Sequence, residues 1–190
     1  MTAPPDVLAF WFADGPDTFR ECWFKRDDAL DREIRIRFGA LAAEARTDAL
    51  SSWRETKAGV LALAILIDQF SRNLHRDSAE AYAADPMMRG IARAAVLDRR
   101  IDLGLTPTQR VFLYLPFEHS ETMADQDLSV ALFEGLRDDP RMARPGGAID
   151  YAWKHRAVIE RFGRFPHRNA ALARVSTAAE AEWLAAGGGF

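Results

Sequence analysis

Several kinds of feature are missing or rare in this chain of 190 residues. It has one cysteine, Cys22, so no disulfide can form within a single molecule, and a reducing, cytoplasmic setting is the simplest expectation. Its longest hydrophobic run, Ala58–Ile67, is about half the roughly 20 residues that a membrane-spanning helix needs. The first residues carry neither a basic segment nor an apolar one, so we expect no signal peptide. The short hydrophobic run therefore predicts a buried core helix at Ala58–Ile67. Since the run is too short to span a membrane, we expect no membrane partner.

An excess of charge of one sign is also missing. The 25 Lys and Arg residues against 28 Asp and Glu residues give a formal net charge of −3. A general nucleic-acid binder carries a clear positive excess. We therefore expect no nucleic-acid partner, although a local basic pocket is compatible with this balance.

Known catalytic and cofactor motifs are absent as well. The four histidines show neither the Glu-x-x-His nor the His-Glu-x-x-His spacing of metal sites. The chain has no Gly-x-Ser-x-Gly elbow, no Walker loop and no dinucleotide-binding glycine fingerprint. We therefore expect no metal and no cofactor.

Helical periodicity is what the chain has instead. Apolar residues recur at helical spacing at Leu30, Ile34, Phe38, Leu41 and Ala45, and no run shows the alternation of a strand. A later helix is expected to begin at Thr122, with Leu128, Ala131, Leu132 and Leu136 on one side. The sequence predicts an all-α fold of about eight or nine short helices. They would form one domain over residues 1–190, as stacked helical hairpins or an irregular bundle.

Helix boundaries can be located from capping residues. The sequence of a capping box occurs at Thr106–Gln109 and at Thr177–Glu180. In a capping box the side chain of each end residue accepts a hydrogen bond from the backbone N–H of the other. Gly163 follows an apolar stripe that includes His155 and Ile159, so it is expected to end that helix. Asp85-Pro86 marks the start of another helix.

Two short segments combine an aromatic residue with an Arg-Asn pair. In Asp68–Asn73, Asp68 and Arg72 are four residues apart, so they share a helix face and can pair locally. The alternative is that Arg72 and Asn73 face a cleft. In Arg161–Asn169 the basic residues are interleaved with phenylalanines, which fits either salt bridges or an anion pocket, since guanidinium groups suit carboxylate and phosphate.

A third segment, Tyr114–Glu121, contains a proline that is expected to kink or end its helix. Glu118 after this break is either an exposed charge at a helix end or an acid, base or cation partner, with His119 as its neighbour. His155 lies on an apolar stripe, which fits a hydrogen-bonded core histidine or one that faces a polar pocket.

These motifs resemble those of a bacterial family catalogued as domain of unknown function 924. The resemblance covers about residues 6–190 and rests on Phe10-Trp11-Phe12, Leu66–Phe70, Arg72-Asn73, Phe112–Glu121, Asp125-Gln126, Arg161–Asn169 and the Gly187–Phe190 ending. Ser71 departs from it, because a proline is expected between Phe70 and Arg72. The resemblance implies a tetratricopeptide-like helical fold and no particular activity.

We expect a cytoplasmic binding protein whose partner is an anionic small molecule or peptide. The pocket is predicted to bring together two distant segments and the residues between them: Asp68, Gln69, Arg72, Asn73, Glu118, His119, His155, Arg164, His167, Arg168 and Asn169. One alternative is a hydrolase or transferase that uses Glu118 with His119 or His155 as acid and base. The other is an interaction scaffold in which the same residues only hold helices together.

Overall fold

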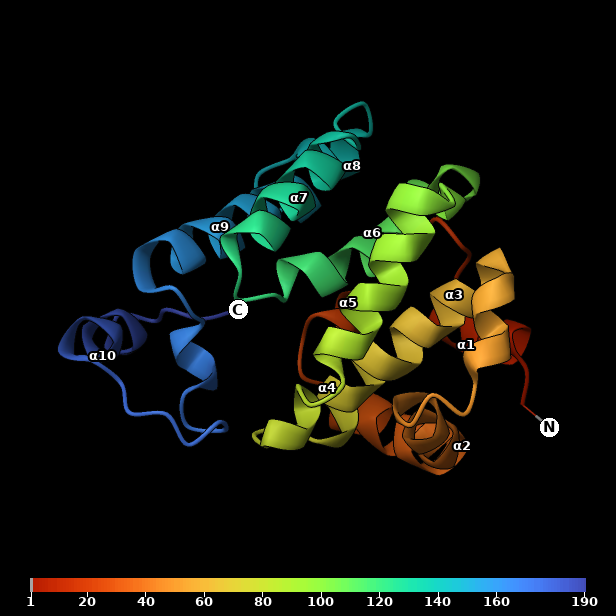
Figure 1. The fold of residues 1–190 in the computed structure, drawn as a ribbon, viewed down its shortest axis with the longest axis horizontal. Coiled ribbons are helices and arrows are strands. Elements are labelled where there is room, and N and C mark those ends of the chain that lie inside the picture. Colours follow the sequence, from red (N-terminus) through yellow and green to blue (C-terminus); the bar gives the residue numbers. More distant parts are fainter. Residues whose placement is uncertain (1) are drawn as a thin grey trace. The chain divides into compact units, whose positions relative to one another are not determined.

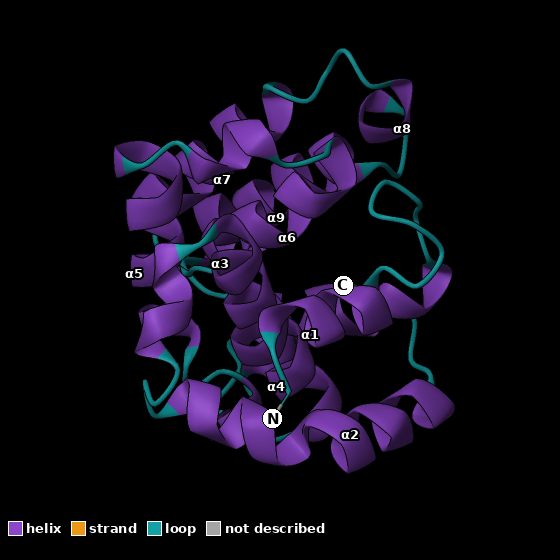
Figure 2. Ribbon diagram, turned by 90° about the vertical axis from the view of Figure 1, so that its right-hand side faces the viewer, coloured by secondary structure: helices purple, strands orange, loops and turns teal. Residues whose placement is uncertain are grey.

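The computed structural model describes residues 2–190, and all regular secondary structure among them is helical (Figures 1 and 2). The all-α class is therefore confirmed. The α-helices are α1 (Pro4–Trp11), α2 (Asp28–Arg46), α3 (Lys57–Ala64), α4 (Phe70–Leu74), α5 (Asp85–Arg93), α6 (Pro107–Glu118), α7 (Met123–Glu134), α8 (Pro140–Ala143), α9 (Ala148–Phe162) and α10 (Ala178–Ala185). Of these, α4 and α8 have only five and four residues.

The described chain divides into two compact units. The N-terminal unit contains the chain up to Arg76 together with Glu80–Pro116, and the C-terminal unit contains Asp77–Ala79 and Phe117–Phe190. A single domain built of tetratricopeptide-like stacked hairpins stays a prediction.

Helix α2 forms as its sequence pattern indicates. The side chain of Asp27 accepts hydrogen bonds from the backbone N–H groups of Ala29 and Leu30, at 2.9 and 3.0 Å, and so caps the helix. The predicted apolar stripe is buried apart from Leu41, which is half-buried, and Ile34 and Phe38 lie at its centre. This one face anchors α2 to the N-terminal unit.

The hydrophobic run also forms the buried helix that was predicted. Helix α3 continues without a break through a π-helical segment, Ile65–Gln69, into α4. Every residue from Val60 to Phe70 is buried, which fits a helix that is apolar all round and surrounded by protein. The wider π turn brings Asp68 and Gln69 inside the unit.

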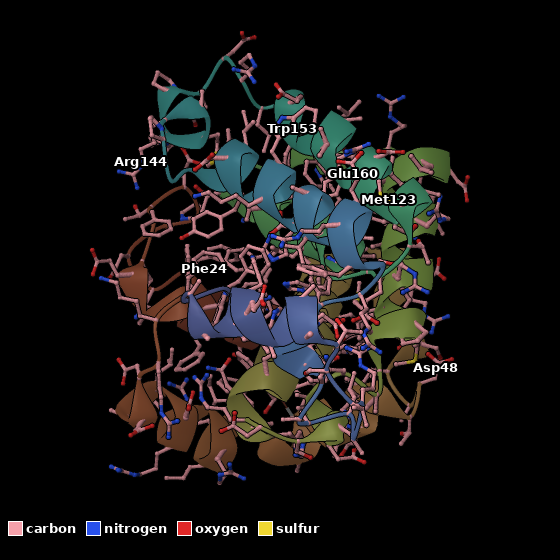
Figure 3. The ribbon with its side chains drawn as sticks, turned by 90° about the vertical axis from the view of Figure 1, so that its left-hand side faces the viewer. Phe24, Asp48, Met123, Arg144, Trp153 and Glu160 are labelled. Atoms are coloured by element: carbon pink, nitrogen blue, oxygen red, sulfur yellow. The ribbon has the colours of Figure 1, made fainter. Side chains whose placement is uncertain are left out.

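In the C-terminal unit, α7 and α9 lie side by side (teal and blue in Figure 1). Helix α9 buries Ile149, Ala152, His155, Val158 and Ile159, and it carries Trp153 and Glu160 on its exposed face (Figure 3). It ends at Gly163, whose φ of 68° is the left-handed conformation that glycine adopts without strain, as predicted.

The apolar side of α7 that the sequence indicates is not the side that the helix buries. Ala131 is exposed, Leu128 and Leu132 are half-buried, and only Leu136, after the end of the helix, is buried. The helix buries the face of Gln126, Ser129, Val130 and Phe133. The physical reason is the side chain of Gln126, which donates hydrogen bonds to two backbone carbonyl groups inside the unit. These bonds turn a polar residue inward, which hydrophobicity alone does not predict.

No helix among residues 2–190 combines the length and apolar character needed to cross a membrane.

The burial of α2 supplies a matched pair of substitutions. Ile34 is completely buried, whereas Ile36, two residues further on, is 77% exposed. We expect Ile34→Ala to lower the free energy of unfolding by about 2–5 kcal/mol, because it removes buried methyl groups and leaves a cavity. Ile36→Ala should change it by less than about 0.5 kcal/mol. Denaturant unfolding of both variants tests this, and equal losses would contradict the assigned face.

Candidate functional site

The turn between α6 and α7 positions two of the predicted site residues. Helix α6 passes its internal proline and ends two residues later, at Glu118. The buried side chain of Gln126 donates to the carbonyl oxygens of Glu118 and Ser120, at 2.7 and 2.6 Å. Asp125 accepts from the hydroxyl groups of Ser120 and Thr122, at 2.7 and 2.8 Å. The carbonyl group of Glu118 at the end of α6 and that of Ser120 in the turn are thereby satisfied, and the turn that carries Glu118 is fixed.

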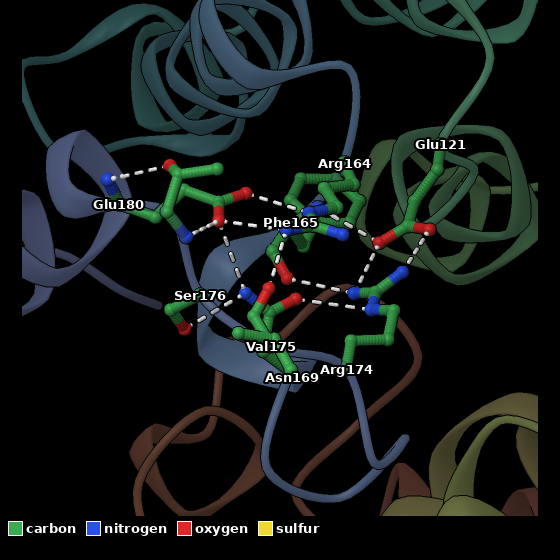
Figure 4. A network of polar contacts seen from close by, with 9 residues as sticks. Glu121, Arg164, Phe165, Asn169, Arg174, Val175, Ser176 and Glu180 are labelled. Atoms are coloured by element: carbon green, nitrogen blue, oxygen red, sulfur yellow. Dashed lines mark hydrogen bonds and ion pairs between the residues drawn. The ribbon is translucent and has the colours of Figure 1, made fainter.

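A second set of contacts fixes the chain after α9 (Figure 4). Arg174 and Glu121 form a two-armed ion pair, with distances of 2.7 and 3.0 Å. Glu121 also accepts from the backbone N–H of Phe165 at 2.8 Å, and Arg174 donates to the carbonyl oxygen of Phe165 at 3.0 Å. The backbone of Phe165 is therefore held on both sides, and its ring is completely buried.

His155 contacts both of these fixed segments, at Glu118 and at Phe165. Its Nδ1 is 2.9 Å from the carbonyl oxygen of Tyr151 and 3.1 Å from Oε1 of Glu118. Both neighbours are acceptors, so Nδ1 carries the hydrogen and Nε2 carries the lone pair of the neutral ring. Burial lowers the pKa of His155 well below 6.5, and the nearby His119 and Arg168 lower it further. The ring is therefore neutral at pH 7, and its Nε2 forms no hydrogen bond to any residue from 2 to 190.

His167 and Arg168 come from the short 3₁₀ segment Pro166–Arg168. Burial, helped by the charge of Arg168, lowers the pKa of His167 to about 4, and its buried Nδ1 has no hydrogen-bond partner among the described residues. Arg168 donates to the carbonyl oxygen of His119 at 3.0 Å and lies 4.5 Å from the centre of the Phe165 ring. The rings of His119 and His155 are 6.3 Å apart.

We call Glu118, His119, His155, His167 and Arg168 the histidine cluster. The sequence predicted all five as site residues, and the C-terminal unit brings them together around Phe165. The arrangement offers one carboxylate, one guanidinium group and two neutral imidazole rings in a largely buried setting. Such a set can bind polar groups and accept a proton.

Two other predicted residues of this unit have a different environment. Arg164 donates with both arms to the buried carboxylate of Glu180, at 2.6 and 2.7 Å. Asn169 donates to Ser176 at 3.0 Å and accepts from Arg174 at 3.0 Å. The guanidinium group of Arg164 holds the pKa of Glu180 well below its usual range. Arg164 and Asn169 therefore tie α10 to the preceding loop, as Figure 4 shows.

The remaining predicted residues lie in the N-terminal unit. Arg72 pairs with Asp68 at 3.1 Å, as the local reading of the sequence predicted, and it also binds both carboxylate oxygens of Asp85, at 3.1 and 3.0 Å. Burial alone would lower the pKa of Arg72, but Asp68 and Asp85 outweigh it and raise that pKa. Gln69 donates to Asp68 at 2.5 Å, and Asn73 donates to Asp31 at 2.7 Å. The predicted hollow shared by Arg72 and Arg168 would join the two units and stays a prediction.

Sequence reasoning missed several residues that hold these sites. Asp85 was read only as a helix start, although a carboxylate at that position can also pair with a buried arginine. The roles of Glu121 and Arg174, 53 residues apart, leave no local trace in the sequence. No group of three or more His, Cys, Asp or Glu side chains within residues 2–190 is placed to hold a metal ion.

Comparison with other proteins agrees with the all-α class. The sequence pattern of the bacterial proteins of unknown function DUF924 matches residues 7–188, and the chain belongs to this family. It is also similar to a solved structure, the protein of unknown function ATU0120 from Agrobacterium tumefaciens. The identity is 38%, the TM-score is 0.83, and the match covers 95% of this chain and 96% of the other. A comparison with curated proteins gave no match.

The role of Gln126 can be tested by removing its side chain. We expect Gln126→Ala to lower the free energy of unfolding by about 1–3 kcal/mol for each of the two buried carbonyl groups that lose their donor. Asp127→Ala is a suitable control, because Asp127 is exposed and pairs with Arg156 at the surface. That variant should lose less than about 1 kcal/mol. If both variants have the stability of the wild type, the turn does not depend on Gln126.

The low pKa of His167 makes stability depend on pH. Between about pH 6.5 and 4 the unfolded chain takes up a proton at this residue that the folded protein does not. Stability therefore falls as the pH drops through this range, by up to about 1.4 kcal/mol per pH unit. Substitution His167→Gln should remove this part of the slope. Urea unfolding between pH 4 and 7 measures it, and identical slopes in the two proteins would mean that His167 titrates normally when folded.

Proposed function

We propose that the histidine cluster is the ligand site of a binding protein that takes an anionic small molecule or peptide. The observation that carries this proposal is His155, a buried neutral histidine whose Nδ1 is occupied by Tyr151 and Glu118 and whose Nε2 has no protein partner among residues 2–190. An imidazole held in this way presents an acceptor of fixed direction.

Unsatisfied polar atoms support a ligand at this position. Buried polar groups in folded proteins nearly always have a hydrogen-bond partner, so exceptions need a reason. The Nδ1 atom of His167 is such an exception within the described chain. Nε2 of His155 also has no protein partner among residues 2–190, but it is not one of the fully buried polar atoms. A donor group of a ligand would satisfy Nε2 of His155, which carries the lone pair, and Nδ1 of His167 can donate or accept according to which of its ring nitrogens carries the hydrogen. Arg168 supplies the positive charge that a carboxylate or phosphate group needs.

The other predicted arginines are better explained as supports. Arg72 and Arg164 each use both arms on a buried carboxylate, Asp85 and Glu180 respectively. These contacts fit the scaffold interpretation of those two residues, in which they hold helices together. We therefore limit the proposed site to the histidine cluster, in a cytoplasmic protein that takes no nucleic acid and no membrane as partner.

A second candidate function is acid–base catalysis. A carboxylate that orients a histidine through Nδ1 and leaves Nε2 as base is the arrangement found in hydrolytic triads. The contact between Glu118 and His155 has this geometry. The lowered pKa of His155 makes it a weak base, which favours binding over catalysis. A hydrolase or transferase activity that survives in Glu118→Gln with an unchanged pH profile would remove this alternative.

Anion binding can be tested by NMR titration of the protein with acetate, inorganic phosphate, benzoate and phenyl phosphate. We expect saturable shifts of the ring signals of His119, His155 and His167 with at least one of these probes. Arg168→Met should weaken this binding at least tenfold, and Arg168→Lys should weaken it less, because it keeps the charge.

Arg161→Met is the matched control. Arg161 is exposed on the same segment and has only Phe162 as a ring neighbour. Its loss should change the affinity less than twofold, with thermal unfolding curves confirming that each variant is folded. The proposal fails if no probe shifts the histidine signals, or if the two Arg→Met variants behave alike.

A further inference from the structure

The ring of Phe190 lies directly on His155. The two ring centres are 3.6 Å apart and the planes differ by 13°, which is a stacked pair. Phe165 and His167 meet the same ring edge-on, with centres at 6.2 and 5.7 Å and planes at 89° and 85°. Tyr151 lies 6.5 Å away on another side. The rings of the histidine cluster and of Phe165 and Tyr151 thus surround a site that fits a flat ring. We call this site the seat, and the ring of Phe190 occupies it.

The segment that carries Phe190 is three consecutive glycines. Gly187 and Gly189 have φ angles of 83° and 143°, which other residues rarely adopt. Gly188 lies against Trp183, so close that a Cβ atom there would be 2.3 Å from the indole ring. The backbone at Gly188 thus packs closely against Trp183, two residues before Phe190. Phe190 itself is 49% exposed, so it can leave its seat without breaking the core.

Phe190 fills the seat without satisfying its polar atoms. Its ring has no donor or acceptor group, and Nε2 of His155 and Nδ1 of His167 have no protein partner among residues 2–190 while it is there. A ring with a hydroxyl or N–H substituent could make the same stacking contact and also donate to Nε2 of His155, and an anionic substituent could pair with Arg168. It would then have an advantage that Phe190 lacks.

We propose that the seat of Phe190 is the ring subsite of the ligand site, and that Phe190 is a built-in occupant displaced by ligands that carry a planar aromatic ring and an anionic group. This inference rests on the function proposed above and names the class of ligand. Because Phe190 is tethered to the site, it competes at a high effective concentration. The apparent affinity for a ligand falls in proportion to the fraction of molecules in which the seat is open.

The test compares wild type with Phe190→Ala, using benzoate and cyclohexanecarboxylate as probes. The two probes have the same charge and nearly the same size, but only benzoate is planar. We expect Phe190→Ala to bind benzoate at least tenfold more tightly than wild type, and to bind cyclohexanecarboxylate at least fivefold more weakly than benzoate. Phe190→Trp keeps a ring in the seat and should bind benzoate as weakly as wild type. Val175→Ala, at an 88% exposed apolar position of the same unit, is the control and should match wild type.

A ligand-free measurement checks the starting point. Ring stacking shifts the proton signals of His155, so these signals should move when Phe190 is replaced by Ala and stay in place in Val175→Ala. If they do not move in Phe190→Ala, the occupant is not on His155 in solution, and the inference is overturned. Thermal unfolding of each variant confirms that the fold is kept.

The remaining outcomes separate this inference from the proposed function. Equal benzoate affinities in wild type and Phe190→Ala would overturn the built-in occupant while leaving the anion site intact. Equal affinities of Phe190→Ala for the two probes would overturn the ring subsite alone. If none of the proteins binds any anionic probe, both the inference and the proposed function are overturned.

Discussion

The contact between Glu118 and His155 is the constraint around which the C-terminal unit is organised. Both side chains are buried, and a carboxylate taken out of water needs a donor close by. Nδ1 of His155, 3.1 Å from Glu118, is one such donor. Because Nδ1 donates to Glu118, it carries the hydrogen of the ring, and Nε2 is the nitrogen that is left to contact a ligand.

The surrounding contacts keep these two side chains in place. Gln126 holds the end of the helix that carries Glu118, and the ion pair of Glu121 and Arg174 holds the backbone of Phe165 beside the histidine rings. A half-satisfied polar network costs stability. Nδ1 of His167 is buried without a partner among the described residues, and so are Oε1 of Gln126 and Oγ of Ser129 in the same unit. The cluster is regarded as a site because two neutral histidine rings lie beside Arg168, whereas Arg72 and Arg164 each bind a buried carboxylate.

Local features of the fold could be predicted from the sequence, and long-range ones could not. The capping boxes at Thr106 and Thr177 are both present, as is the helix end at Gly163, because each depends on a few neighbouring residues. The buried face of α7 differs from the apolar side that the sequence indicates, because Gln126 finds its partners in another segment. A pattern based on hydrophobicity has no way to recognise a buried amide that is satisfied from elsewhere.

The same division applies to the candidate site. Residue types and helix breaks identified all five members of the histidine cluster, because histidine and arginine beside aromatic residues are uncommon within an apolar pattern. The carbonyl of Tyr151 is a local partner of His155 within α9, but the carboxylate of Glu118 and the ring of Phe190 come from other segments and depend on how these meet. The predicted convergence with Arg72 depends on contacts of longer range still.

The state of His155 is the most direct test of this account, and nitrogen-15 NMR of the histidine side chains measures it. At pH 7 we expect a neutral ring with its hydrogen on Nδ1, and no titration of that ring near pH 6.5. A ring with its hydrogen on Nε2, or a positively charged ring at pH 7, would contradict it.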